Sequence, residues 1–206
     1  MNRDRTTCYG RAGAPEQGVT LIEVTVAVVI LMIVASMAIV QMQPTLQRYR
    51  SNAAANQVQS VLREARELAI SERRTIVVQF VNKNTLELFQ ITEPANTISA
   101  APFLTVPIEN TVEFMTFGGE VDTPDNFSGA LSVPNGIYFD GVTGGPNSGM
   151  EFQTDGEFTD GNGNPINGTV FVGVPNVPSS ARAVTVLGNT GRIHTWYGGP
   201  NFWFDQ

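Results

Sequence analysis

An unbroken apolar run over residues 24–40 constrains this chain more than any other part of its sequence. The run contains only Val, Ile, Leu, Met and Ala, with one Thr and one Ser. As a helix, these 17 residues rise about 26 Å, close to the ~30 Å hydrocarbon thickness of a bilayer. The sequence therefore predicts one membrane-spanning helix, over residues 19–43.

Glu23 lies at the start of this run and is the only charged residue between Gly18 and Arg48. A carboxylate inside hydrocarbon costs ~3 kcal/mol unless it lies near the interface or meets a cation. A lone acid at this position therefore predicts a specific role for Glu23.

The eight residues from position 16, Glu-Gln-Gly-Val-Thr-Leu-Ile-Glu, resemble the processing site of type IV prepilins and type II secretion pseudopilins. In that family, a membrane prepilin peptidase cuts after the Gly and N-methylates the new N-terminus. The acid at the fifth mature position helps to place the subunit in a filament. The resemblance implies that Gly18 precedes the cut, that Val19 becomes the methylated residue and that Glu23 acts in filament assembly. The family usually has Phe where this chain has Val19.

Simple physics agrees with these roles, because the cut creates an ammonium group at Val19. In a membrane-embedded assembly, that charge and the Glu23 carboxylate of a neighbouring subunit can neutralise each other. The alternative is an ordinary signal peptide or membrane anchor with an incidental Glu. An ordinary signal peptide, however, has its cleavage site after the apolar run, whereas Gly18 precedes it.

The pattern divides the chain into a polar leader over residues 1–18, the span over 19–43, an amphipathic helix over 44–73 and a β domain over 74–206. Pro44 favours a kink near the end of the span. Apolar residues then recur at spacings near three and four, which is typical of a helix that packs on a sheet. They are Leu46, Tyr49, Ala53, Val58, Val61, Leu62, Ala65, Leu68 and Ala69.

Residues 75–81 and 85–91 are rich in β-branched and aromatic residues and flank Asn82-Lys83-Asn84, which predicts a hairpin. The last third predicts three more strands, two of them joined by a hairpin turn at 188–191. Their ranges are 169–174, 182–187 and 192–197. Shorter strands are expected near 111–117, 137–140 and 149–153.

The C-terminal pattern resembles the GspH/FimT branch of minor pseudopilins over about residues 18–196. The likeness rests on a strand that ends near Asp155-Gly156, a second strand, and a final hairpin that closes with Gly191-Arg192. It implies an α+β, pilin-like fold, in which a long N-terminal transmembrane and amphipathic helix packs on an antiparallel β-sheet domain. It also implies a single-pass inner-membrane protein with a periplasmic C-terminal domain, and other pseudopilins of a filament or tip complex as partners.

Charge argues against nucleic acid as a partner. From Thr75 onward the chain has three basic and thirteen acidic residues, a net charge of −10 that repels phosphate backbones. Arg192 is followed by Ile193 and His194 rather than by a second arginine. The arginines of the amphipathic helix are expected to lie on a solvated face, although they could form a basic strip. They are Arg48, Arg50, Arg63 and Arg66.

The sequence predicts no catalytic site, cofactor or metal. The one cysteine, Cys8, lies in the leader, and the one histidine, His194, lies mid-strand, where it is expected to point outward. The segment from Asp160 to Asn164 has oxygen-bearing side chains at alternate positions, as calcium loops do, but it also suits a tight turn. The aromatic tail is expected to fold onto its own domain or to dock a neighbouring subunit. It contains Trp196, Tyr197, Phe202, Trp203 and Phe204.

Together these features predict a minor pseudopilin, a structural subunit of the type II secretion pseudopilus and not an enzyme. The alternative is a minor pilin of a type IV pilus, concerned with pilus assembly or DNA uptake. A membrane-anchored periplasmic enzyme is a third class. The sequence leaves open the choice of system, the secreted substrates, the neighbouring subunits, calcium at residues 160–164 and the role of the tail.

Overall fold

The computed structural model describes residues 18–92, 97–108, 111–118, 124–127, 135–140, 142, 149–199 and 203–205, apart from the side chains of 39–41. It falls into two units, which divide between residues 43 and 44. Apart from Gly18, the predicted leader lies outside the described residues, and so do Cys8 and Phe202.

The first unit contains the beginning of helix α1 (Leu21–Glu72). Thr20 caps this helix, because its hydroxyl oxygen accepts a hydrogen bond from the backbone N–H of Glu23 at 3.3 Å. By length and composition, α1 can cross a membrane. The described side chains from Val19 to Met37 are exposed, so this unit leaves its apolar surface uncovered.

In the second unit, α1 buries one face in the β domain. The buried residues recur at the spacing of an amphipathic helix, and they are Ser51, Ala54, Ala55, Val58, Val61, Leu62, Ala65 and Ala69. The prediction that Leu46, Tyr49 and Ala53 belong to this face was wrong, since all three are exposed. Leu46 and Tyr49 precede the buried series, and Ala53 lies about 100° around the helix from Ala54.

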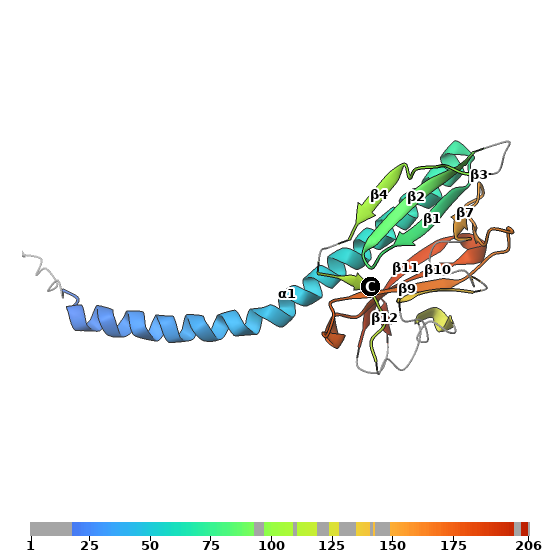
Figure 1. Ribbon diagram of the computed structural model, residues 1–206. Helices are drawn as coiled ribbons and strands as arrows, with labels where there is room; N and C mark the ends of the chain where they lie inside the picture. The colour runs from blue at the N-terminus through green and yellow to red at the C-terminus, as the bar shows by residue number, and fades with distance from the viewer. Residues whose placement is uncertain are drawn as a thin grey trace, which may run out of the picture. The chain divides into compact units, whose positions relative to one another are not determined.

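The first sheet is built on the predicted hairpin of β1 (Ile76–Val81) and β2 (Thr85–Thr92), which pair antiparallel from Ile76↔Gln90 to Val81↔Thr85. Asn82 takes a left-handed conformation in the turn, at φ 56°. The sheet order is β3-β2-β1-β7-β8, and β4 also pairs with β2 (Figure 1). The added strands are β3 (Thr97–Ile98), β4 (Leu104–Pro107), β7 (Glu151–Phe152) and β8 (Phe158–Thr159).

The second sheet has the order β12-β11-β10-β9-β5, and β6 also pairs with β9. Its centre is the hairpin of β10 (Arg182–Leu187) and β11 (Arg192–Gly198), joined by the 3-10 turn η4 (Gly188–Thr190). All of its described pairings are antiparallel. The remaining strands are β5 (Glu113–Phe114), β6 (Ile137–Phe139), β9 (Gly168–Gly173) and β12 (Trp203–Asp205).

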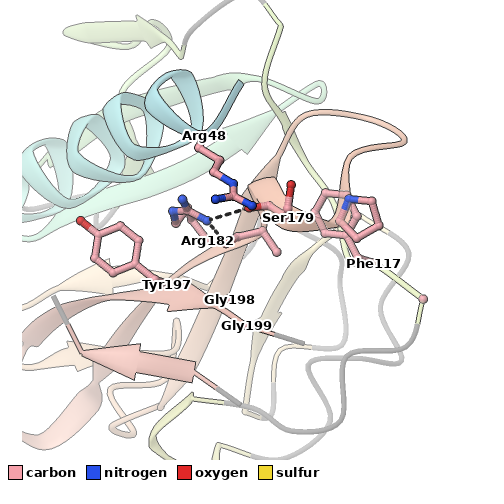
Figure 2. Close-up of a pocket in the computed structure, with 10 residues that line it drawn as sticks. Arg48, Phe117, Ser179, Arg182, Tyr197, Gly198 and Gly199 are labelled. Atoms are coloured by element: carbon pink, nitrogen blue, oxygen red, sulfur yellow. Dashed lines mark hydrogen bonds between the residues drawn. The ribbon is translucent and has the colours of Figure 1, made fainter. Parts of the chain in front are cut away.

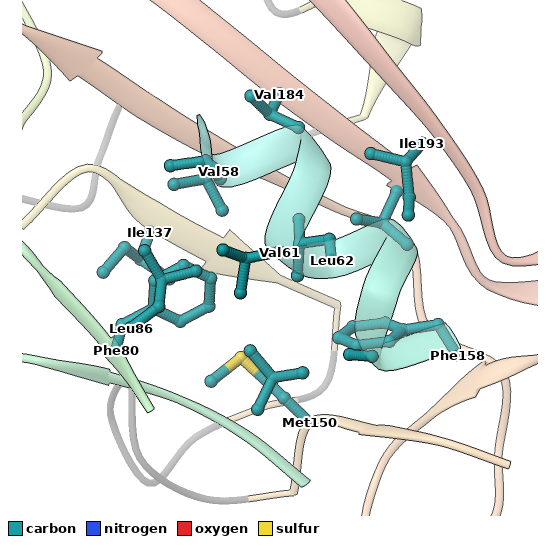
Figure 3. Packing of buried hydrophobic residues seen from close by; sticks show 14 of the residues in the cluster. Val58, Val61, Leu62, Phe80, Leu86, Ile137, Met150, Phe158, Val184 and Ile193 are labelled. Atoms are coloured by element: carbon teal, nitrogen blue, oxygen red, sulfur yellow. The ribbon is translucent and has the colours of Figure 1, made fainter. Parts of the chain in front are cut away.

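The core of this unit lies where α1 meets both sheets (Figure 3). Val58 and Leu62 of α1 belong to one buried cluster with Phe80 of the first sheet and Val184 of the second. Burying a side chain of this size contributes ~2 kcal/mol. Among the described strands, none belongs to both sheets, so the helix joins them through packing.

The predicted α+β class, with a long N-terminal helix followed by antiparallel sheet, is confirmed. Both predicted hairpins are present, and the short strands expected near 111–117, 137–140 and 149–153 are β5, β6 and β7. The sequence analysis missed β3, β4, β8 and β12. Three of these have only two or three residues, too few to show an alternating pattern, and β4 lies in a Pro-containing segment.

Candidate functional sites

Gly18 and Val19 lie just before the first residue of α1, and Glu23 lies in its first turn. Val19 is 69% exposed. Thr20 and Glu23 stand in the Thr-x-x-Glu spacing of a helix capping box, which the sequence analysis did not use. Glu23 therefore has a local role besides its predicted one, because an acid in the first turn interacts favourably with the helix dipole.

The Asp155-Gly156 turn and the Gly191-Arg192 element, which were singled out separately, meet in the structure. Gly191 adopts φ 59°, and a Cβ atom added there would lie 2.0 Å from the carbonyl oxygen of Gly156. Glycine is therefore required at position 191 for two reasons: the Gly156 carbonyl lies too close for a side chain, and the backbone has a left-handed conformation.

Arg192 is exposed, but its charge is paired. Its Nη2 atom lies 3.2 Å from Oδ1 of Asp125, and Oδ2 of the same carboxylate accepts a hydrogen bond from the Thr185 hydroxyl at 2.5 Å. The Thr185 hydroxyl in turn accepts one from Nε1 of Trp196 at 3.0 Å. These bonds tie Asp125, in the 3-10 turn η1 (Pro124–Asn126), to the outer surface of β10 and β11.

A hollow of about 400 Å³ brings helix arginines next to this element. Its lining includes Arg63, Arg66 and Arg192, with Glu67 as the acid among them. Two of the four helix arginines, Arg63 and Arg66, therefore line the same hollow as Arg192. The Nε atom of Arg66 donates a hydrogen bond to the carbonyl oxygen of Gly156.

His194 lies mid-strand on the outer side of β11, as expected, and its side chain is half-buried there. Its Nε2 atom lies 2.7 Å from Oδ1 of Asp205 in β12, and its ring meets Trp196 edge-on at 4.8 Å. The contact fastens the last described strand to the sheet.

The segment from Asp160 to Asn164 forms a tight turn around its own carboxylate. Oδ1 of Asp160 accepts hydrogen bonds from the backbone N–H groups of Asn162 at 2.9 Å and Asn164 at 2.8 Å. The Asn164 side-chain amide donates to the same carboxylate, and these bonds lower the pKa of Asp160 to about 2. The geometry favours the turn over calcium, because N–H donors occupy the carboxylate that would bind the ion.

Among the described residues, no group of three or more His, Cys, Asp or Glu side chains could hold a metal.

The described part of the aromatic tail folds onto its own domain. Trp203 packs on Phe171 with ring centroids 5.5 Å apart, and β12 pairs with β11. Phe204 remains 49% exposed.

The N-terminal segment matches a known sequence motif. Residues 14–39 match the family model of the prokaryotic N-terminal methylation motif. This chain carries that motif. The match bears out the resemblance seen in residues 16–23. A comparison with curated proteins found no match.

Two solved structures similar to this chain are minor pilin-type proteins. One is the minor pseudopilin EpsH of the type 2 secretion system of Vibrio cholerae, with 14% identity, a TM-score of 0.46, and coverage of 73% of this chain and 98% of that one. The other is the type IV minor pilin FimU of Pseudomonas aeruginosa, with 16% identity, a TM-score of 0.48, and coverage of 76% and 94%.

Proposed function

We propose that this chain is a precursor that a prepilin peptidase cuts between Gly18 and Val19, and that the mature chain is a structural subunit of a membrane-anchored filament. One observation carries the proposal: the methylation motif covers residues 14–39, and this stretch includes the apolar first part of α1, which the rest of its unit leaves uncovered. Such an apolar surface can contact lipid while the chain is in the membrane, and the helices of neighbouring subunits once the chain is in a filament. In this proposal residues 1–18 are the leader, 19–43 the span, 44–73 the amphipathic helix and 74–206 the β domain.

The proposed role of Glu23 follows from charge balance. Cutting after Gly18 creates an ammonium group on Val19, which the peptidase then methylates. A carboxylate in the first turn of a neighbouring α1 neutralises that cation in an environment where neither charge is well solvated. Glu23 is the acid in the first turn of α1.

Of the two filament systems, we place the chain in the type II secretion pseudopilus as a minor pseudopilin that supports protein export. The β domain is acidic, and the arginine of its Gly-Arg element already forms an ion pair with Asp125. Both features disfavour binding to phosphate backbones. The role is structural, at the inner membrane, with the β domain in the periplasm and other pseudopilins as partners.

Co-expression with a prepilin peptidase tests the processing step. We expect mass spectrometry to find a mature chain that begins at N-methyl-Val19. Gly18→Leu should block the cut by crowding the peptidase subsite, whereas the matched change Gly118→Leu in the β domain should leave the cut intact. An uncut wild-type chain, or a cut at another bond, would count against the proposal.

The second candidate is a minor pilin of a type IV pilus that takes part in DNA uptake, and the hollow lined by Arg63, Arg66 and Arg192 favours it. A mobility-shift titration of the full chain in detergent separates the two. The secretion assignment expects no DNA binding at physiological salt. Salt-sensitive micromolar binding that is lost in Arg63→Gln/Arg192→Gln, but kept in the control Lys83→Gln, would move the assignment to the pilus.

A further inference from the structure

A second hollow, of about 380 Å³, lies at the end of the β domain where α1 passes the β9-β10 connection (Figure 2). Arg48 of α1 and Arg182 of β10 both line it, together with the rings of Phe117, Pro178 and Tyr197. We call it the Arg48–Arg182 pocket. Figure 2 shows Arg48 descending from the helix toward Arg182.

Arg182 is 5% exposed, and its guanidinium group is held rigidly. Nε donates to Oδ1 of Asn52 at 2.5 Å, and Nη1 donates to the carbonyl oxygen of Ala181 at 2.6 Å. The guanidinium carbon lies 4.8 Å from the centre of the Tyr197 ring, a cation–π distance. In the described part of the chain, no hydrogen bond engages Nη2, so two N–H donors remain for a ligand.

The two positive charges have no counter-ion among the described residues. Each of the three ion pairs found there lies elsewhere and includes neither Arg48 nor Arg182. Burial lowers the pKa of Arg182. Tyr197 partly opposes this shift, and the nearby Arg48 adds to it. Arg182 has hydrogen-bond partners but no counter-ion, and a buried charge without a counter-ion favours the binding of an anion beside it.

The residues that line the pocket indicate which class of anion it can bind. Phe117, Pro178 and Tyr197 give it apolar sides, as in most sites for organic ligands. A carboxylate is planar and matches the edge of a guanidinium group. The net charge of −10 from Thr75 onward repels a phosphate dianion about twice as strongly as a carboxylate monoanion.

We propose that the Arg48–Arg182 pocket binds a carboxylate attached to an apolar group, which the two guanidinium groups hold while the rings contact the apolar part. The carboxylate comes either from a small organic acid or from an acidic residue of a partner polypeptide. The site does not depend on the filament role proposed above.

The test is an NMR titration of the full chain, labelled with ¹⁵N-arginine, in detergent micelles. Benzoate should shift the Nε–H signal of Arg182, and benzamide, which has the same shape without the charge, should not. Arg48→Gln should weaken benzoate binding about tenfold or more. Arg48 is exposed, so this change leaves the core intact, and Arg63→Gln is the matched control that keeps wild-type affinity.

The source of the carboxylate is read from a second pair of probes, N-acetyl-Phe-Glu-amide and its Gln counterpart. Tighter binding of the Glu peptide than of benzoate identifies a polypeptide partner, and the reverse order identifies a small organic acid. Equal shifts with benzoate and benzamide, unchanged affinity in Arg48→Gln, or tighter binding of inorganic phosphate would each overturn the proposal. So would benzoate binding that appears only in Glu120→Gln/Asp122→Asn, because the chain would then be supplying its own carboxylate.

Discussion

The Nε atom of Arg66 donates a hydrogen bond to the carbonyl oxygen of Gly156 at 3.1 Å, and so fastens α1 to the turn between β7 and β8. Gly191, in the turn between β10 and β11, packs on both residues. The helix and one turn from each sheet therefore meet at a single point.

Gly191→Ala should destabilise this meeting point. The new Cβ would lie 2.0 Å from the Gly156 carbonyl oxygen and 2.7 Å from Nε of Arg66. We expect the free energy of unfolding to fall by ~3 kcal/mol, measured by urea denaturation. Gly163→Ala is the control, because Gly163 also has a positive φ but has no atom within 4 Å of an added Cβ. It should cost ~1 kcal/mol. Equal losses in the two variants would mean that the close approach at Gly191 is unimportant.

Glu151→Gln should stabilise the chain at neutral pH. Glu151 is buried in β7, and burial raises its pKa above the ordinary value of 4.5. When the pKa of an acid is higher in the folded chain than in the unfolded chain, its protonated form stabilises the fold. This contribution to the free energy of unfolding is fully present below pH ~4.5 and is lost as pH rises through the raised pKa. A pKa that differs by one between the folded and the unfolded chain corresponds to about 1.4 kcal/mol of stability.

Urea denaturation of wild type and Glu151→Gln between pH 4 and 8 checks this expectation. The advantage of the variant should grow with pH and disappear near pH 4. Glu64→Gln, an exposed change on α1, is the control. A Glu151→Gln chain that is less stable than wild type at pH 7 would contradict the expectation.

Asp160 should show the opposite pH dependence. Hydrogen bonds from Asn164 lower its pKa from 3.8 to about 2. The stability linked to this depressed pKa is present above pH ~3.8 and is lost as pH falls through about 2. A ¹³C NMR titration of the Asp160 carboxylate should give a midpoint near pH 2 in wild type and a higher midpoint in Asn164→Ala. The same midpoint in both chains would show that Asn164 does not hold the carboxylate.

Substitutions at Glu23 separate its two possible roles. Glu23→Ala removes both the charge and a side chain that suits the capping-box position, whereas Glu23→Gln removes only the charge, because Gln also suits this position. If the charge acts in assembly, both variants should insert in the membrane as well as wild type or better, and both should lose incorporation into filaments, measured by cross-linking. Wild-type incorporation of Glu23→Gln would leave only the cap as the role of this residue.

The parts of the structure that the sequence predicted are those set by local pattern. The apolar run over residues 24–40, the Asn82-containing turn and the β-branched residues of β9, β10 and β11 each carry their signal within a few neighbours. The core face of α1 was misplaced at its start, because periodicity alone does not say where the sheets begin to cover a helix.

Contacts between distant segments could not be predicted in this way. The pairing of Arg192 with Asp125 depends on where the η1 turn comes to lie, and the Arg48–Arg182 pocket depends on how α1 passes β10. The sequence did contain one signal that was not used, the Thr-x-x-Glu spacing of Thr20 and Glu23, which marks the start of a helix.

The connection between β9 and β10, which forms part of the wall of the Arg48–Arg182 pocket, is locked by one hydroxyl group. Oγ of Ser180 accepts from the backbone N–H of Val174 at 2.8 Å and donates to the carbonyl oxygen of Val177 at 2.6 Å. Ordering a mobile side chain on binding costs ~1 kcal/mol. The connection between β9 and β10 is already ordered in the folded protein, so it loses no further conformational entropy when a ligand binds. A ligand would therefore meet a preorganised wall, and its association rate would be set by diffusion and electrostatic steering rather than by loop closure.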